Sequence, residues 1–201
     1  MSNDDRADRG GGLARAPWER VGSREIHETP FLTLREDKVR IPDGRVIDYG
    51  VVDCGECVGV LPLLPDGRVV MVGQYRYIAG RFTWEMPTGG VHEGEGVEAA
   101  AQRELAEEAG YVAGRLTHLC TYHTSKSSLD ETAHLYLGEA LSEATATPDD
   151  TEWTETTIMT FDAVLAMVLG GEIRDGMTII AVLATARLRD AGALHGGREG
   201  N

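Results

Sequence analysis

The 201-residue sequence has few cysteines, few basic residues and no long apolar run, and each shortage excludes a class of protein. Three cysteines are too few for a disulfide framework, and only Cys54 and Cys57 lie close together in the sequence. A structural zinc site would need two more ligands at suitable spacing, which Cys120 and the six histidines do not supply. We therefore expect the cysteines to be ordinary strand residues.

Acidic residues outnumber basic ones. The sequence has 19 Lys and Arg and 33 Asp and Glu, so its formal net charge is −14. Nucleic acids and anionic membranes bind through Lys and Arg that neutralise phosphates, so neither is an expected partner. The first residues, MSNDDRADRGGG, are acidic and polar where a signal peptide would be basic and then apolar. We expect a cytoplasmic protein, for which small phosphorylated substrates remain possible.

The length fits one main domain with a smaller attachment. Residues 1–16 and 191–201 have few apolar side chains, and we expect both to be disordered tails. Alternating apolar positions on either side of a turn at Pro42–Gly44 predict a small antiparallel sheet over residues 17–55. Residues 56–190 then form the main domain.

Within residues 56–190, the stretches CVGVLPLL and RVVMVGQYR flank a Pro-Asp-Gly turn and predict a hairpin in the core sheet. Further strands are expected near residues 116–122, 133–137 and 154–159. Two apolar stripes predict helices over residues 161–169, with Thr160 as N-cap, and over residues 177–188.

The segment GGVHEGEGVEAAAQRELAEEAGY, residues 89–111, carries three glutamates among alanines. At about 100° per residue, a helix places Glu104 and Glu108 inside its apolar arc and Glu107 at the border of that arc. Carboxylates one turn apart at an apolar surface repel each other and lose hydration, so they either take up protons or bind a cation. Because all-oxygen ligation suits Mg²⁺ or Mn²⁺, the pattern predicts a divalent-metal site on this helix, and Gly110 is expected to end the helix.

Seven fixed residues with fixed gaps resemble the Nudix box, namely Gly89, Glu95, Arg103, Glu104, Glu107, Glu108 and Gly110. The segments VGQYRY, WEMPTGG and GGEIRDGMTI resemble the flanks of that box in the ADP-ribose and nucleoside-diphosphate-sugar branch of Nudix hydrolases. The resemblance implies an α+β fold, a Nudix-type α/β/α sandwich with a mixed sheet, preceded by the small antiparallel N-terminal sheet. It also implies metal-dependent hydrolysis of a nucleoside diphosphate to a nucleoside monophosphate and a phosphorylated group.

The resemblance implies roles for several residues of the box and for the residue just before it. Glu104, Glu107 and Glu108, together with the backbone carbonyl of Thr88, match the positions of metal ligands. Glu107 is also expected to take part in catalysis, and Arg103 matches the arginine that orients a box glutamate. The expected ion is Mg²⁺ or Mn²⁺.

Other residues match substrate positions of the branch. Arg76 ends the VGQYR strand, where a guanidinium fork suits a diphosphate, and Glu85 is either a substrate-side acid or a structural strand end. The polar loop ATATPDDTEWTE matches the one that delivers a catalytic glutamate, for which Glu152 is the best match. Trp18 and Tyr49 match positions that stack the nucleobase, or else they simply pack in a core, and a homodimer is expected.

The identity of the substrate stays open at this point. ADP-ribose hydrolases of this branch typically carry a proline about fifteen residues after the box, whereas this chain has none from Gly89 to Thr147. ADP-ribose and another nucleoside-diphosphate sugar are therefore both candidate substrates. The alternatives are a ligand-sensing Nudix domain without turnover, which would be expected to have lost box acids, and a pyrophosphohydrolase of RNA ends, which the acidic composition disfavours.

Replacing Glu152 by glutamine should lower kcat by roughly 10² to 10⁴-fold with a smaller change in KM, because the general base is lost. Steady-state kinetics of the purified variant measure this effect. If Glu155→Gln or Asp150→Asn shows the large loss instead, the loop is catalytic but Glu152 is not its base.

Overall fold

The computed structural model describes residues 17–145 and 154–194. The expected tail over residues 1–16, residues 195–201 of the expected tail over 191–201, and the loop residue Glu152 lie outside these ranges. The chain divides into two compact units. The first ends at Cys54 and takes in Ser127–Leu129, and the second begins at Gly55.

The first unit is an antiparallel sheet of three strands, namely β1 (Glu19–Glu28), β2 (Thr33–Arg40) and the first part of β3 (Val46–Pro62). The predicted turn joins β2 to β3, and Gly44 adopts a left-handed φ of 88° that suits a residue without a side chain. Asp37, Val39 and Val51 are the buried side chains of this unit within the described residues. The sheet therefore has a very small core of its own.

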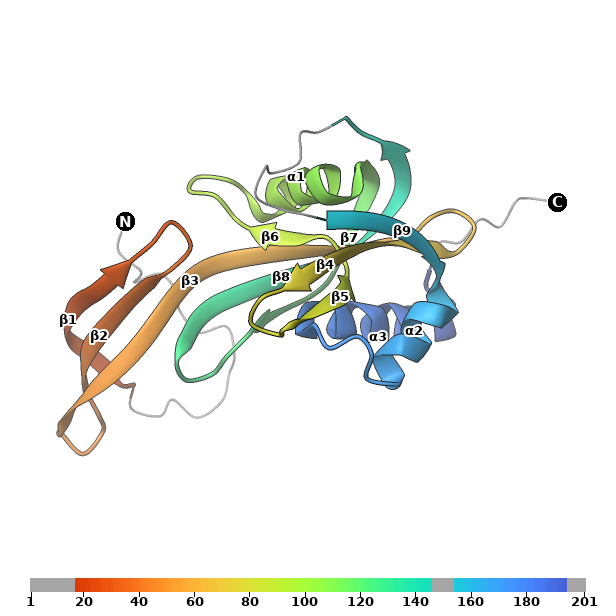
Figure 1. Cartoon of the computed structure of the whole chain (residues 1–201). Helices are drawn as coiled ribbons and strands as arrows, with labels where there is room; N and C mark the ends of the chain where they lie inside the picture. Colours follow the sequence, from red (N-terminus) through yellow and green to blue (C-terminus); the bar gives the residue numbers. More distant parts are fainter. Residues whose placement is uncertain (1–16, 146–153, 195–201) are drawn as a thin grey trace. The chain divides into compact units, whose positions relative to one another are not determined.

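The second unit contains two sheets (Figure 1). In one, the end of β3 lies between β6 (Thr88–Gly90) and β8 (Leu129–Glu143), and β7 (Tyr111–His123) follows β8. Contacts from Glu56 to His134 and from Leu63 to Gly138 show that β3 and β8 run parallel, whereas β7 and β8 are antiparallel. The expected mixed sheet is confirmed. The other sheet is antiparallel, with the order β5 (Arg81–Glu85), β4 (Arg68–Arg76) and β9 (Thr154–Thr160).

Helices cover both sides of these sheets, as Figure 1 shows for α1 (Val97–Ala109) on one side and for α2 (Phe161–Leu169) and α3 (Gly176–Asp190) on the other. Small residues and Leu105 of α1 pack on one core cluster, and α2 and α3 pack on a second cluster. The α/β/α sandwich is therefore confirmed. None of the helices in the described ranges is long and apolar enough to span a membrane.

The ends of the helices follow local signals in the sequence. Gly110 ends α1 in the left-handed region, with φ of 73°, and its N–H donates to the carbonyl of Ala106. Thr160 caps α2, because its hydroxyl accepts a hydrogen bond from the backbone N–H of Ala163. Both caps agree with the prediction.

The predicted hairpin in the core sheet is wrong in its pairing. The turn exists, with Leu64 N–H donating to the carbonyl of Arg68, but β3 and β4 then separate into different sheets after a single bridge between Leu63 and Val69. The physical reason is that both edges of β4 are taken by β5 and β9, while the end of β3 pairs with β6 and β8. Alternating apolar residues define a strand but not its neighbours.

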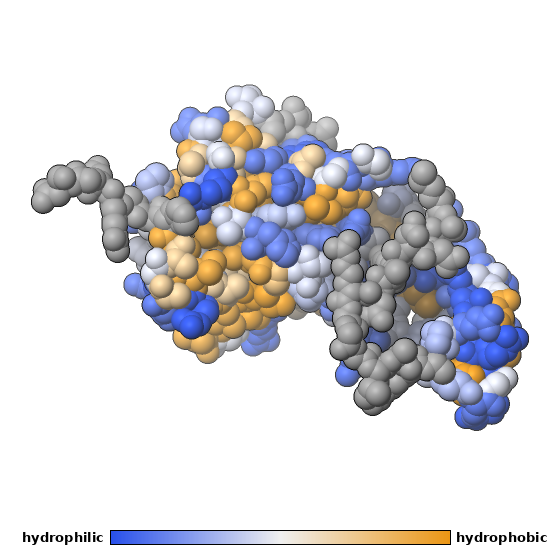
Figure 2. All heavy atoms as spheres, turned by 180° about the vertical axis from the view of Figure 1, so that it is seen from behind, coloured by the Kyte–Doolittle hydropathy of each residue, from blue (hydrophilic) through white to orange (hydrophobic). Residues whose placement is uncertain are grey.

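The surface of the second unit shows an apolar area over the end that carries α2 and α3, at the lower left of Figure 2. Leu169 and Leu183, which are 72% and 41% exposed, belong to these helices. Hydrophilic residues surround this area on the face shown. Single exposed apolar side chains of this kind are normal in globular domains.

Candidate active site

Helix α1 places the glutamates of the box at the edge of the core. Its alanines are good helix formers, and Ala101, Leu105 and Ala109 are buried against the sheet. Glu104 shares that side of the helix, and its side chain is only 12% exposed, whereas the Glu107 side chain is 36% exposed. The angular placement expected from the sequence is therefore correct.

Arg103 joins the acids of the box to the loop before the helix. Its Nε and Nη2 donate to the two carboxylate oxygens of Glu95 at 3.0 Å each. Its Nη1 donates to Glu104 at 2.7 Å and to Glu107 at 3.1 Å. Nη2 also donates to the carbonyl of Gly90 at 2.8 Å. One guanidinium thus neutralises part of the charge of three carboxylates and holds the loop to α1.

These contacts change the protonation behaviour of both partners. Hydrogen bonds from Arg103, assisted by one from the backbone N–H of His92, outweigh the opposing effect of burial and lower the pKa of Glu95 to about 2. The hydrogen bonds that Arg103 donates to Glu95, Glu104 and Glu107 raise the pKa of Arg103. Both groups therefore carry full charge at neutral pH.

Gly89 lets the loop approach the helix. A Cβ atom at this position would lie 2.0 Å from the carboxylate carbon of Glu104, so no other residue fits without displacing that side chain. The preceding residue, Thr88, donates its backbone N–H to Oε2 of Glu108 at 2.8 Å. The loop backbone and the two glutamates are therefore packed directly against each other.

The donor set at this place fits a hard divalent ion, because it consists of carboxylates with backbone beside them. Within residues 17–145 and 154–194, no three His, Cys, Asp or Glu side chains already converge as a metal-binding group. Hydrogen bonds from Arg103 hold Glu104 and Glu107, and the N–H of Thr88 holds Glu108.

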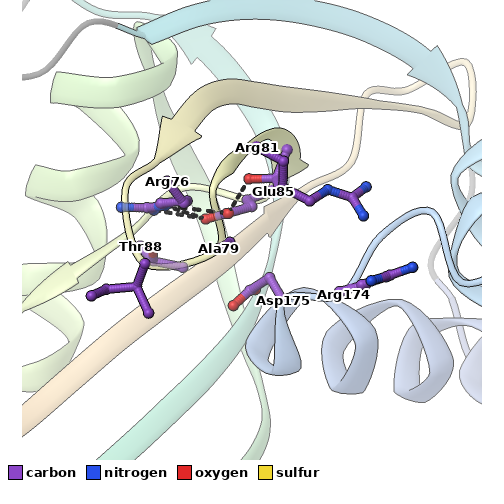
Figure 3. A pocket seen from close by; sticks show the side chains of 9 residues that line it. Arg76, Ala79, Arg81, Glu85, Thr88, Arg174 and Asp175 are labelled. Atoms are coloured by element: carbon purple, nitrogen blue, oxygen red, sulfur yellow. Dashed lines mark hydrogen bonds and ion pairs between the residues drawn. The ribbon is translucent and has the colours of Figure 1, made fainter.

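Beside Thr88 lies a pocket of about 450 Å³ (Figure 3). It is formed by the β4–β5 turn, by β5 and β6, and by the segment that begins α3. Its lining residues are Arg76, Ile78, Ala79, Arg81, Thr83, Glu85, Thr88, Arg174 and Asp175. Thr88 belongs both to this pocket and to the contact with Glu108, so the pocket adjoins the glutamates of α1.

Arg76 and Glu85 form an ion pair within the pocket. Nη2 of Arg76 lies 2.7 Å from Oε2 of Glu85, and Nε donates to both carboxylate oxygens. Burial lowers the pKa of Arg76, but the hydrogen bonds and the charge of Glu85 outweigh this effect and the pKa is raised. Glu85 is only 7% exposed and also accepts from the hydroxyl of Thr83, so it holds Arg76 in position.

Asp175, the N-cap of α3, was not among the residues predicted for the site. Its Oδ2 accepts from the N–H of Thr178 at 2.7 Å and from the Thr178 hydroxyl at 2.6 Å. The N–H of Met86 donates to that buried hydroxyl at 3.0 Å. Asp175 therefore fixes α3 to the WEMPTGG segment. The GGEIRDGMTI motif pointed to this region, but not to this contact.

The remaining residues considered for the site lie in the first unit, outside the described ranges or in β9. Trp18 and Tyr49 belong to the first unit, where their rings meet edge to face with centroids 6.2 Å apart. Glu152 and Asp150 lie outside the described residues. Glu155 is in β9, opposite Gly73 of β4.

Comparison with models of known families identifies the family of this chain. Residues 55–177, more than half of the chain, match the model of the NUDIX domain. Residues 18–52 match the model described as the nucleoside diphosphate sugar hydrolase N-terminal domain. The chain belongs to the Nudix family and is a Nudix hydrolase, which confirms the interpretation of the box.

Relatives with known names cover most of the chain. An ADP-ribose pyrophosphatase of Bacillus subtilis (strain 168) is 32% identical over 164 residues, which is 81% of this chain and 89% of that protein. An ADP-ribose pyrophosphatase of Mycobacterium tuberculosis is 32% identical over 175 residues, 86% of this chain and 84% of that protein. The solved structure of an ADP compounds hydrolase has a TM-score of 0.78 at 16% identity and covers 91% of this chain and 100% of its own, which shows a shared fold.

Replacing Glu95 by glutamine should make stability less dependent on pH. Because the pKa of Glu95 is lowered from 4.5 to about 2 in the folded state, its ion pair with Arg103 stabilises the protein above pH 4.5, and this stabilisation is lost as the pH falls toward 2. Urea unfolding at several pH values from 7 to 3 measures the free energy of unfolding. The deficit of the variant should shrink below pH 4.5. A deficit that stays constant with pH would contradict the account, and Glu98→Gln on the exposed side of α1 is the control.

Proposed function

We propose that this Nudix hydrolase cleaves the diphosphate bond of ADP-ribose or a related nucleoside-diphosphate sugar and releases a nucleoside monophosphate and a sugar phosphate. The observation that carries the proposal is the position of Thr88, which contacts Glu108 of α1 and lines the pocket that contains Arg76. Helix α1, which we propose binds the metal, is therefore adjacent to the pocket that contains Arg76. The two ADP-ribose pyrophosphatases similar to most of this chain support the substrate class.

Glu104, Glu107, Glu108 and the backbone carbonyl of Thr88 are the groups that would hold the divalent ion, and we propose Mg²⁺ as that ion because all four are oxygen donors. When bound, such an ion neutralises phosphoryl oxygens and lowers the pKa of the attacking water. Arg103 holds Glu104 and Glu107 by hydrogen bonds and so limits the directions in which their carboxylates can turn.

Arg76 is the proposed ligand of the diphosphate. A guanidinium binds phosphate oxygens through a planar fork, and Glu85 fixes the plane of that fork. Glu85 therefore acts on the substrate through Arg76 and is a positioning residue. The acceptor for the proton of the attacking water stays a prediction, because Glu152 lies outside the described residues.

We also propose a homodimer in which the first unit of the chain contributes to the substrate site. Only three side chains of that unit are buried within the described residues, so the sheet has little core with which to stand alone. Its match to the N-terminal domain of nucleoside diphosphate sugar hydrolases supports a role with the substrate. The cytoplasmic location and the lack of nucleic-acid and membrane partners stay predictions from composition.

Replacing Glu108 by glutamine should nearly abolish metal-dependent hydrolysis of ADP-ribose and leave the fold intact. The change keeps the volume of the side chain and removes a charge that the ion needs. Hydrolysis rates and thermal unfolding of the same preparation measure both effects, and Glu98→Gln removes a charge from the exposed side of the same helix as the control. Turnover by Glu108→Gln at the rate of the wild type would contradict the proposed role of Glu108 in metal binding.

Replacing Trp18 by alanine should raise KM by roughly tenfold or more while sparing kcat, because a planar ring stacked on a base contributes about 1 to 3 kcal/mol. Trp18 is 55% exposed and so has surface available for a base. Steady-state kinetics measure the change. Equal KM values for variant and wild type would contradict the stacking role of Trp18. Light scattering that shows only monomer at micromolar concentration would contradict the proposed homodimer.

A further inference from the structure

Three arginines line one pocket of a protein whose formal net charge is −14. Arg76 is paired with the buried Glu85. Arg81 and Arg174 differ, since neither forms an ion pair with an acidic side chain in the part of the chain that the structure describes. The pocket therefore contains two guanidinium groups whose charge no carboxylate of the described residues offsets by direct contact.

The loop between α2 and α3 holds both of these arginines. Nη2 of Arg81 donates to the carbonyl of Glu172 at 2.9 Å, and Nε of Arg174 donates to the carbonyl of Gly171 at 3.1 Å. The two accepting carbonyls belong to consecutive residues of the same loop. Figure 3 shows Arg81 and Arg174 on one side of the pocket and Arg76 and Thr88 on the other.

Each of these guanidiniums has hydrogen-bonding capacity left over. A guanidinium carries five N–H donors, and within the described residues Arg81 and Arg174 each use one of them on a carbonyl. An anion bound by both guanidiniums would offset their positive charge. A phosphate monoester is the anion whose geometry best fits two guanidinium forks.

Asp175 supplies a different kind of contact in the same pocket. Its Oδ2 is used at the start of α3, while its Oδ1 accepts no hydrogen bond from the residues that the structure describes. A carboxylate oxygen accepts from a sugar hydroxyl but repels a phosphate. The pocket therefore offers a hydroxyl acceptor at Asp175 and an anion-binding side at Arg81 and Arg174.

We infer that this pocket accepts an appended group that carries a phosphate of its own, so that the preferred substrates are nucleoside diphosphates joined to a phosphorylated sugar. Arg81 and Arg174 bind the distal phosphate, and Asp175 accepts from a hydroxyl of the sugar. A pocket of about 450 Å³ has room for a group of this size. The inference rests on the proposed function, because Arg76 and the glutamates of α1 hold the diphosphate itself.

Calorimetry with sugar phosphates tests the phosphate-binding side without any need for hydrolysis. Wild type with Mg²⁺ should bind ribose 1,5-bisphosphate at least about tenfold more tightly than ribose 5-phosphate, the factor expected from one charge-assisted hydrogen bond. The double variant Arg81→Gln/Arg174→Gln should bring the ratio close to one, with each single variant in between. Arg187→Gln, which removes an arginine from the last turn of α3, is the matched control and should keep the ratio.

Three results would overturn the inference. The first is equal affinity of wild type for the two sugar phosphates, and the second is a double variant, folded by circular dichroism, that keeps the preference. The third is inorganic phosphate that binds as tightly as the bisphosphate and displaces it, which would indicate a site for free phosphate.

A kinetic comparison separates this inference from the proposed function. ADP-ribose and its derivative phosphorylated on the C1 hydroxyl of the terminal ribose are assayed side by side. A higher kcat/KM for the phosphorylated compound, lost in the double variant, supports the inference. If neither compound is hydrolysed while the binding preference persists, the proposed function fails and the phosphate-binding pocket stands. If both are hydrolysed equally, the proposed function stands and the inference fails.

Discussion

The contact of one guanidinium with three carboxylates and a carbonyl is the interaction on which the rest of the site depends. Glu104, Glu107 and Glu108 are close together on one helix, and like charges at this spacing repel each other. Arg103 offsets that repulsion by binding two of them, and it ties Glu95 and the carbonyl of Gly90 to the same helix. The loop before α1 and the acids of α1 are therefore one structural unit.

Small residues make this arrangement possible. Gly89 leaves the space that the Glu104 carboxylate fills, and buried alanines bring α1 close to the sheet. Thr88 directly precedes Gly89, and it both donates its N–H to Glu108 and lines the pocket with Arg76. The chemistry that we propose follows from this arrangement, because Thr88 lies between the glutamates proposed to hold the metal and the arginine proposed to hold the diphosphate.

Local patterns in the sequence predicted most of the fold. The α1 helix, its glycine end, the Thr160 cap and the membership of the Nudix family are all confirmed. The pairing of β4 was not predictable, because it depends on which strands occupy its edges, and the residues of β9 that pair with β4 lie at least 80 positions further along the chain. The link from Asp175 through Thr178 to Met86 was missed for the same reason, since it joins segments that are 92 residues apart. The roles of individual site residues stay predictions.

Paramagnetic broadening by Mn²⁺ tests the central claim most directly, because it locates the ion without any need for turnover. In amide NMR spectra, substoichiometric Mn²⁺ should broaden the resonances of Thr88, Gly89, Glu104 and Glu108 first, and Glu108→Gln should weaken that effect at the same ion concentration. Broadening that begins elsewhere in the chain, or that is the same in wild type and in the variant, would contradict the assignment of the metal site to the α1 glutamates.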